Sequence, residues 1–256
     1  MVSVHPVAAG GFSSAASTSA RIRARYARAS VGQLVDTIRL EGPGARVVDV
    51  GAGTGILTGQ LRRLGIECVA VEPSTDMARH LRLALPDVPV VLGAAEHLPL
   101  PGGRAAVYTA AQAFHWFDPE AALAEAARVL RPGGWVCLMW NVPDRAVPWV
   151  AGLTELVEAR AGGRPDPLHD DAFVETAVRS SGRFGPVEVT PHPNPVPAGV
   201  EAVLERLRST SSVAAMQPEP REDLLAAARD LLADHDMEGD FEYPHQTVLY
   251  RCRLED

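Results

Sequence analysis

Hydrophobic positions along the first 145 residues follow two spacings: short β-branched runs, and longer segments in which apolar residues recur every three or four positions. The short runs predict strands at 45–51, 67–72, 88–93, 104–112 and 135–141. The longer segments predict helices at 21–40, 56–65, 74–85 and 118–130. Strands and helices that alternate in this order predict an α/β fold, in which helices cover both faces of a mostly parallel sheet.

Residues with strong positional preferences mark the ends of three of these helices. Gly65 is expected just past the last turn of the helix at 56–65, where glycine tolerates a left-handed backbone. Ser74 is expected to be an N-cap, and Asp118 another, with Pro119 at the first helical position behind it. The stretch "RPGG" at 131–134 is expected to break the chain before the fifth strand.

The pattern becomes irregular after about residue 145, and prolines cluster between 186 and 197. Helical spacing recurs near 147–161, 170–180, 200–210 and 219–234, and strand-like runs recur near 185–190 and 245–253. The stretch 191–243 is therefore predicted to be a helical insertion between the last two strands. Open α/β sheets bind ligands beyond the carboxyl ends of their strands, so such an insertion is expected to act as a cap over the site.

Charge and composition narrow the class of partner. The chain carries 32 acidic residues against 24 basic ones, a net charge of −8, which argues against nucleic acid as the main partner. Every basic residue is arginine. Together with abundant Ala, Gly, Pro and Val, this looks like the coding bias of a GC-rich genome.

The cysteines and the apolar segments indicate in which cellular compartment the protein is expected. Cys68, Cys137 and Cys252 lie in separate apolar runs, which predicts buried thiols rather than a disulfide framework or a zinc site. No apolar stretch approaches the ~20 residues that a membrane-spanning helix needs. The first eighteen residues lack the basic start and apolar block of a signal peptide. We expect a cytoplasmic protein, a monomer or a homodimer, with no membrane partner.

A glycine-rich turn follows the first predicted strand in "VVDVGAGTG". Gly51, Gly53 and Gly55 form G-x-G-x-G, and Ile56 stands where a dinucleotide-binding fingerprint has its third glycine. The chain has no lysine for a P-loop. Such a turn exposes backbone amides and permits close approach of a ligand. Glu72 ends the next predicted strand, where a carboxylate can accept both hydroxyls of a ribose. These features predict a nucleoside ligand without a pyrophosphate.

This arrangement resembles motif I and the acidic second-strand end of class I S-adenosylmethionine-dependent methyltransferases. Four further stretches follow in the order and spacing of that family, so that the motifs span 47–134: "VAVEPSTDM", "GAAEHLPLPGG", "QAFHWFD" and "RVLRPGG". Over about residues 12–253, the chain resembles bacterial small-molecule methyltransferases with the "FHWF" signature.

The resemblance implies a Rossmann-like, doubly wound, mostly parallel seven-stranded sheet with an antiparallel last strand. It also implies three parts of the chain. An N-terminal arm or lid spans 1–30, and a cofactor-binding core spans 31–145. The C-terminal half, 146–256, completes the sheet and carries the helical substrate cap at about 191–243.

The resemblance further implies which residues bind S-adenosylmethionine, whose product is S-adenosylhomocysteine. The glycine turn would contact the methionine part of the cofactor, and the carboxylate at the end of the second strand would bind the ribose. Later positions would line the adenine and, last, the transferring methyl. In chain order these residues are Gly51, Ala52, Gly53, Thr54, Glu72, Pro73, Met77, Ala95, Glu96 and Gln112.

His115, in "AFHWF", is the candidate catalytic residue. Histidine is a natural base near neutral pH, so it could take a proton from a hydroxyl acceptor. A structural imidazole explains the position at least as well. The stretch "HDD" at 169–171 is interpreted as a helix cap, and no metal site is predicted.

The function these residues predict is S-adenosylmethionine-dependent methylation of a small organic molecule, with an oxygen acceptor favoured and specialised metabolism as the context. The alternatives are an N- or C-methyltransferase, or a protein that binds S-adenosylmethionine without transferring its methyl. The sulfonium is an activated donor, so positioning and exclusion of water supply much of the rate. A base is needed for a hydroxyl or an ammonium acceptor, but not for a carboxylate.

Overall fold

The computed structural model describes residues 25–160 and 171–255. These residues divide into two compact units. The sheet unit comprises 25–140, 171–192 and 247–255, and the helical unit comprises 141–160 and 193–246. Most of the predicted N-terminal arm, residues 1–24, therefore lies outside the described residues.

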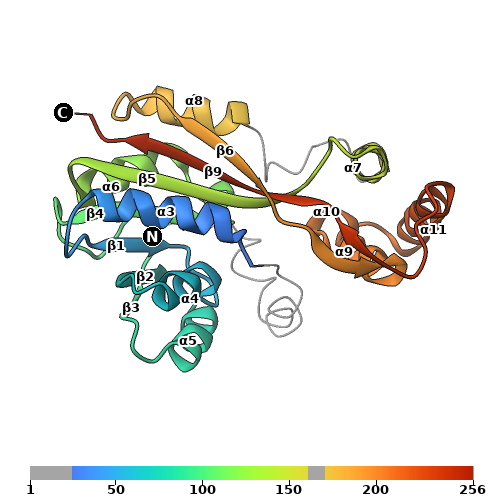
Figure 1. The fold of residues 1–256 in the computed structure, drawn as a ribbon, viewed down its shortest axis with the longest axis horizontal. Helices are drawn as coiled ribbons and strands as arrows, with labels where there is room; N and C mark the ends of the chain where they lie inside the picture. Colours follow the sequence, from blue (N-terminus) through green and yellow to red (C-terminus); the bar gives the residue numbers. More distant parts are fainter. Residues whose placement is uncertain (1–24, 161–170, 256) are drawn as a thin grey trace. The chain divides into compact units, whose positions relative to one another are not determined.

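The sheet contains seven strands within the described residues, in the order β3-β2-β1-β4-β5-β9-β6 (Figure 1). Strands β1 to β5 pair in parallel and the last strand, β9, runs antiparallel, which confirms the predicted Rossmann-like α/β sheet. Their bounds are β1 Val47–Val50, β2 Cys68–Glu72, β3 Val90–Leu92, β4 Ala105–Ala111, β5 Leu130–Pro143, β6 Glu188–Pro193 and β9 His245–Arg253.

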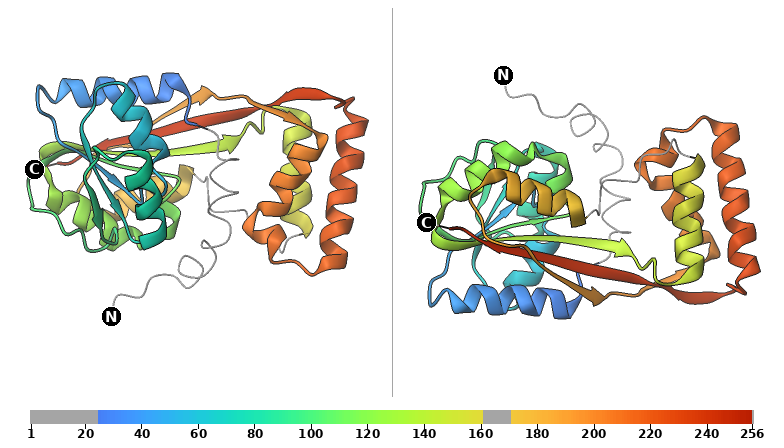
Figure 2. Two further views of the ribbon diagram at one scale, coloured as in Figure 1. Left: turned by 90° about the horizontal axis from the view of Figure 1, so that it is seen from below. Right: turned by 90° about the horizontal axis from the view of Figure 1, so that it is seen from above.

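Helices cover both faces of this sheet. They are α3 Arg28–Leu40, α4 Ile56–Arg63, α5 Thr75–Ala84, α6 Pro119–Val129 and α8 Asp171–Ser181. Figure 2 shows α3 and α4 on one face and α6 and α8 on the other. One apolar cluster joins the first face to the sheet, with Leu34, Leu61, Val107, Cys137 and Leu249 all fully buried in it. Burial of this kind, at about 25 cal/mol per Å², is the main force that holds the layers together.

The predicted helix ends are confirmed in the backbone. Ser74 accepts a hydrogen bond from the Met77 amide, and Asp118 accepts one from Ala121. Gly65 has φ +77°, and the amide that follows it donates back to Leu61 at 3.1 Å, as in a Schellman cap.

Two predicted boundaries are wrong. Within the described residues, the helix predicted at 21–40 begins at Arg28, because the Tyr26 and Ala27 amides donate to Gln60 and Thr247 instead of forming helical bonds, and 21–24 lie outside those residues. The stretch "RPGG" at 131–134 does not break the chain before β5. It lies within that strand, and the pairing register with β4 shifts there to accommodate it.

The helical unit has a core of its own. Its helices are α7 Pro148–Arg160, α9 Val200–Ser209, α10 Ser211–Ala214 and α11 Pro218–Asp234. They bury Trp149, Leu153, Leu204 and Leu224 in one cluster. The unit also contains an antiparallel ribbon, β7 Val196–Gly199 with β8 Asp240–Tyr243, that the sequence did not predict. Whether this region caps the site remains a prediction.

The three cysteines are free thiols and buried, as predicted. Burial raises the pKa of Cys68 and of Cys252 to about 12, and it raises the pKa of Cys137 as well. Across the described ranges, no helix is long and apolar enough to cross a membrane.

Candidate active site

The register of the sheet brings the predicted site residues to one edge. Val50 of β1 pairs with Val71 of β2, and Ala111 of β4 pairs with Met139 of β5. Because these strands are parallel, the residues that come directly after these paired positions lie at the carboxyl edge, where α/β sheets bind ligands. Those residues are Gly51, Glu72, Gln112 and Trp140.

The glycine turn is bound tightly to β2. The Gly51 and Ala52 amides both donate to the Val71 carbonyl, at 2.9 and 3.1 Å. Gly51 has φ +66°, and a Cβ there would lie 2.6 Å from the Cβ of Ala113. Gly51 is therefore required by packing as well as by backbone conformation.

Gly53 differs, because its φ is +58° but the nearest atom to an added Cβ is the Met77 sulfur at 3.9 Å. The turn thus presents an open face at Gly53, between the end of β1 and the start of α5. Thr54, the next predicted residue, is partly exposed beside it. This open face is where the resemblance places the cofactor, so the residues present fit the group.

Glu72 holds the turn from the neighbouring strand. Its side chain is buried, and its two carboxylate oxygens accept the Gly53 amide at 2.8 Å and the Ser74 amide at 2.9 Å. A carboxylate offers about four lone-pair sites, so these two bonds leave capacity for ribose hydroxyls. The sequence predicted the ribose role and missed the structural one.

Asp49 lies under the turn and was not among the predicted site residues. Only 1% of it is exposed, and Thr58 donates to its carboxylate at 2.5 Å. Its pKa is raised to about 7, mainly by burial and in lesser part by the negative charge of Glu72, against the lowering effect of the hydrogen bond from Thr58. The available signal was an acid inside the apolar run "VVDV".

The residues predicted to surround the adenine are more dispersed. Pro73 is exposed at the end of β2, and Met77 is partly buried in the first turn of α5. Ala95 is buried, and Glu96 accepts the Asp118 amide at 2.9 Å, which ties this loop to the start of α6. Their contact with adenine stays a prediction.

Gln112 has a strained backbone at the end of β4. Its φ is +53°, in the left-handed region that residues other than glycine seldom adopt, and its amide donates to the Met139 carbonyl at 2.8 Å. Strain of this kind persists only where surrounding structure enforces it and is concentrated at functional sites.

His115 lies in the 3₁₀ turn η1 Phe114–Trp116 and is partly exposed. Its Nδ1 accepts a hydrogen bond from the indole of Trp140 at 3.3 Å, and its ring lies 4.8 Å from that of Trp116. The turn is close to the glycine loop, since the ring of Phe117 would come within 3.1 Å of a Cβ on Gly51.

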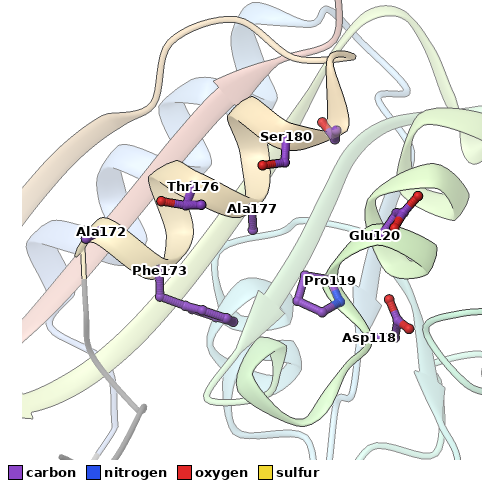
Figure 3. Close-up of a pocket in the computed structure, with 9 residues that line it drawn as sticks. Asp118, Pro119, Glu120, Ala172, Phe173, Thr176, Ala177 and Ser180 are labelled. Atoms are coloured by element: carbon purple, nitrogen blue, oxygen red, sulfur yellow. The ribbon is translucent and has the colours of Figure 1, made fainter.

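A separate cavity of about 740 Å³ lies between the start of α6 and helix α8 (Figure 3). In the figure, the ring of Phe173 extends toward Pro119. The lining residues are Asp118, Pro119, Glu120, Ala172, Phe173, Thr176, Ala177, Ser180 and Ser181. None of the predicted cofactor residues lines it, so we do not assign the cofactor to this cavity.

Comparison with known proteins decides the family. A family model described as a methyltransferase domain matches residues 48–138, which hold the glycine turn, Glu72 and η1. An uncharacterized methyltransferase of Mycobacterium tuberculosis is 36% identical over 212 residues, covering 82% of this chain and 83% of its own. The chain is a class I S-adenosylmethionine-dependent methyltransferase.

Solved structures agree with the fold of this methyltransferase. A putative type II methyltransferase from Anaeromyxobacter dehalogenans is 26% identical, with a TM-score of 0.65 over 91% of this chain and 97% of its own. A phosphoethanolamine N-methyltransferase of Haemonchus contortus, solved with S-adenosylhomocysteine, has a TM-score of 0.60 at 15% identity, over 100% of this chain and 61% of its own. The methyltransferase uses S-adenosylmethionine as its cofactor.

Proposed function

We propose that this methyltransferase transfers the methyl group of S-adenosylmethionine to an oxygen of a small organic molecule. The observation that carries the proposal is the shared carboxyl edge, where the glycine turn, with its open face at Gly53, packs through Gly51 against Ala113, in the segment that holds the strained Gln112 and the imidazole of His115. The bound cofactor supplies an activated methyl, and the chain has to position the acceptor beside it.

We assign each cofactor role to one segment. The turn from Gly51 to Thr54 would hold the methionine part, and Glu72 would accept the ribose hydroxyls. Pro73 and Met77 would line one face of the adenine, with Ala95 and Glu96 at its edge. Gln112 would lie beside the transferring methyl.

The net charge and the side chains at the edge support this choice of acceptor. A net charge of −8 disfavours nucleic acid, and an imidazole is suited to a hydrogen bond with an oxygen. We place the enzyme in specialised metabolism, on the GC-rich bias of its composition, and in the cytoplasm. The N-terminal arm and the 191–243 region would exclude water from the acceptor side.

Calorimetry with S-adenosylmethionine tests the cofactor site. Hydrogen bonds to a charged group contribute about 1.5–3 kcal/mol each, so Glu72→Ala should weaken binding at least about tenfold. Glu67→Ala is the matched control, because Glu67 is an exposed glutamate next to the other end of β2. NAD should not bind appreciably, and tighter binding of NAD than of S-adenosylmethionine would overturn the site assignment.

Release of S-adenosylhomocysteine in the presence of small acceptors tests the transfer itself. Formation of the product only when an acceptor is added supports the proposed activity. A protein that binds S-adenosylmethionine but yields no methylated oxygen compound would instead be an N- or C-methyltransferase or a protein that uses the cofactor in another way.

A further inference from the structure

The hydrogen bond between Trp140 and His115 has a defined direction. Trp140 is 2% exposed in β5, directly after the residue that pairs with the end of β4, and its indole Nε1 lies 3.3 Å from Nδ1 of His115. An indole nitrogen is only a donor, so the indole donates and the imidazole accepts.

The acceptor role of Nδ1 fixes the tautomer of the neutral ring. With its lone pair on Nδ1 directed at the indole, the imidazole of His115 carries its proton on Nε2. In that state Nε2 donates hydrogen bonds. The ring can take a proton from a substrate only at Nδ1, and doing so would break the bond to Trp140.

The indole is held in place by packing. Trp140 meets the ring of Tyr250 edge to face, with centroids 5.4 Å apart and an interplanar angle of 89°. The Tyr250 hydroxyl in turn donates to the carboxylate of Asp171 at the start of α8. Trp140 is therefore a positioning residue, because rotating the indole away from His115 would disrupt a fully buried contact.

Carboxylates on the same side of the sheet unit already accept hydrogen bonds from backbone amides. Glu72 accepts the Gly53 and Ser74 amides, Glu96 accepts the Asp118 amide, and Asp118 accepts the Ala121 amide. This part of the molecule thus offers an oriented donor at His115, while these carboxylates are bound to backbone amides.

We propose that the acceptor is the carboxylate of a small organic acid, that His115 donates its Nε2–H to it, and that the product is a methyl ester. The inference rests on the methyl transfer proposed above. One carboxylate oxygen forms a bond to the methyl carbon, while the carbon–sulfur bond breaks and its electron pair stays on the sulfur of S-adenosylhomocysteine. A carboxylate is already ionised at neutral pH, so no proton is released and no base is required.

Paired acceptors test the substrate class. Benzoate, cinnamate and octanoate are compared with benzyl alcohol, cinnamyl alcohol, octanol and benzylamine, in the presence of the full chain and S-adenosylmethionine. We expect S-adenosylhomocysteine to form with acids only, and alkali to release the transferred methyl as methanol, as from an ester. Methylation of an alcohol or the amine while the acids stay inert would overturn the inference.

Variants of His115 separate a donor from a base. Glutamine places an amide donor at this position but cannot take a proton, so His115→Gln should retain kcat/KM within about tenfold of the wild type. His115→Ala should lose roughly 10- to 100-fold, as expected for a lost bond to a charged group. Equal losses in both variants, in the 10²–10⁴ range typical of a removed base, would overturn the inference. His80→Gln, an exposed histidine on α5, should leave the rate unchanged.

Nitrogen NMR of histidine-labelled protein tests the tautomer without any turnover. The chain has 8 histidines, so the His115 signals are assigned by their loss in His115→Gln. We expect the Nε2–H form in the wild type and a changed spectrum in Trp140→Phe. Trp135→Phe is the control, because that indole donates to Glu41 at 3.1 Å and not to a histidine.

The Nδ1–H form in the wild type would overturn the inference whatever the acceptor. A wild-type protein that fails to bind S-adenosylmethionine, or binds it and methylates no member of the panel, would contradict the proposed function instead. In that case the tautomer spectrum alone still decides whether His115 is a donor.

Discussion

At the scale of single residues, the glycines of one short turn have different physical reasons to be glycine. An added Cβ would lie 2.6 Å from Ala113 at Gly51 and 2.9 Å from Leu81 at Gly55. Those two positions are closed by the protein itself. At Gly53 the same atom would have open space, so the glycine there leaves room for something outside the chain. The motif therefore combines two packing requirements with one requirement for access.

Alanine at Gly53 should affect the cofactor more than the fold. Its Cβ clears the protein, so the cost to stability is limited to the left-handed backbone, about 1–2 kcal/mol. Cofactor affinity should fall roughly tenfold or more, because the methyl occupies the open face. Gly51→Ala should lower the melting temperature further, since it adds a clash with Ala113. Calorimetry and thermal melting on both variants check this, and unchanged affinity in Gly53→Ala would contradict it.

Asp49 should make the protein less stable as pH rises. Its folded pKa of about 7 lies above the unfolded value near 3.9, so the folded state binds more protons between these values. The contribution of Asp49 to the free energy of unfolding is therefore fully present below about pH 4 and is lost as pH rises through 7. The loss amounts to up to about 4 kcal/mol. Asp49→Asn should therefore be more stable than the wild type at pH 8.

Urea unfolding across pH 4 to 8 measures this difference. The advantage of Asp49→Asn should shrink steadily toward pH 4, where the carboxyl is protonated in both states. Asp36→Asn on the exposed face of α3 should show no such trend. If the difference in unfolding free energy between Asp49→Asn and the wild type did not change with pH, Asp49 would not titrate as described.

At the scale of elements, helix α4 connects the ligand-binding turn to the rest of the sheet unit. It begins directly after Gly55, whose carbonyl accepts the Gly59 amide at 2.8 Å. At its other end, Gly65 and Ile66 donate back to Arg62 and Leu61. The helix is only 8 residues long, so both ends matter to its stability.

Two glycine-to-alanine changes should have opposite effects on the free energy of unfolding. Gly65 has φ +77° and no neighbour within 4 Å of an added Cβ, so alanine there costs backbone strain alone, about 1 kcal/mol. Gly32 lies inside α3, also with open space around its Cβ, and alanine there should stabilise by about 0.5–1 kcal/mol. Thermal melting of the pair checks the cap, and a Gly65→Ala protein as stable as the wild type would argue against it.

At the scale of the whole molecule, the chain builds two cores and passes between them four times. Three of these crossings lie within the described residues, at 140–141, 192–193 and 246–247, and the fourth falls between residues 160 and 171. Each unit buries its own apolar cluster. Their titrating groups should therefore report on the two units separately.

His245 should make the helical unit sensitive to acid. It is 2% exposed, its Nδ1–H donates to the Tyr243 carbonyl, and burial with the positive charge of Arg206 lowers its pKa to about 4. In the unfolded state this histidine has a pKa near 6.5, so the unfolded state binds more protons between pH 4 and 6.5. The contribution of His245 to the free energy of unfolding is therefore full above pH 6.5 and is lost as pH falls toward 4. The loss at pH 4.5 should be about 2–3 kcal/mol.

Urea unfolding of the helical unit at pH 7.5 and 4.5 checks the prediction. Unfolding is monitored by the fluorescence of Trp149, whose ring lies 5.1 Å from that of Tyr243. His245→Gln should lose less stability between the two pH values than the wild type. His235→Gln, exposed beyond α11, should behave like the wild type. An equal loss in all three proteins would assign the acid sensitivity elsewhere.

Local patterns predicted the strands, most helices and the glycine turn, because periodicity and caps such as Ser74 act between near neighbours in sequence. The ribbon of β7 and β8 was missed because it is short and contains Pro197 and Gly199. The bond between Trp140 and His115 was missed because it depends on the register of two strands. The two amides held by Glu72 depend on backbone angles in the turn that spacing alone does not specify.

The burial of all three native thiols makes the protein suited to site-directed labelling. With pKa values raised by burial, Cys68, Cys137 and Cys252 should resist maleimide at pH 7, so one introduced cysteine would be the only reactive thiol. Ser209→Cys at the end of α9 and Leu83→Cys on α5 are both exposed positions. A fluorophore on the first that responds to S-adenosylmethionine, with a silent one on the second, would report movement of the predicted cap.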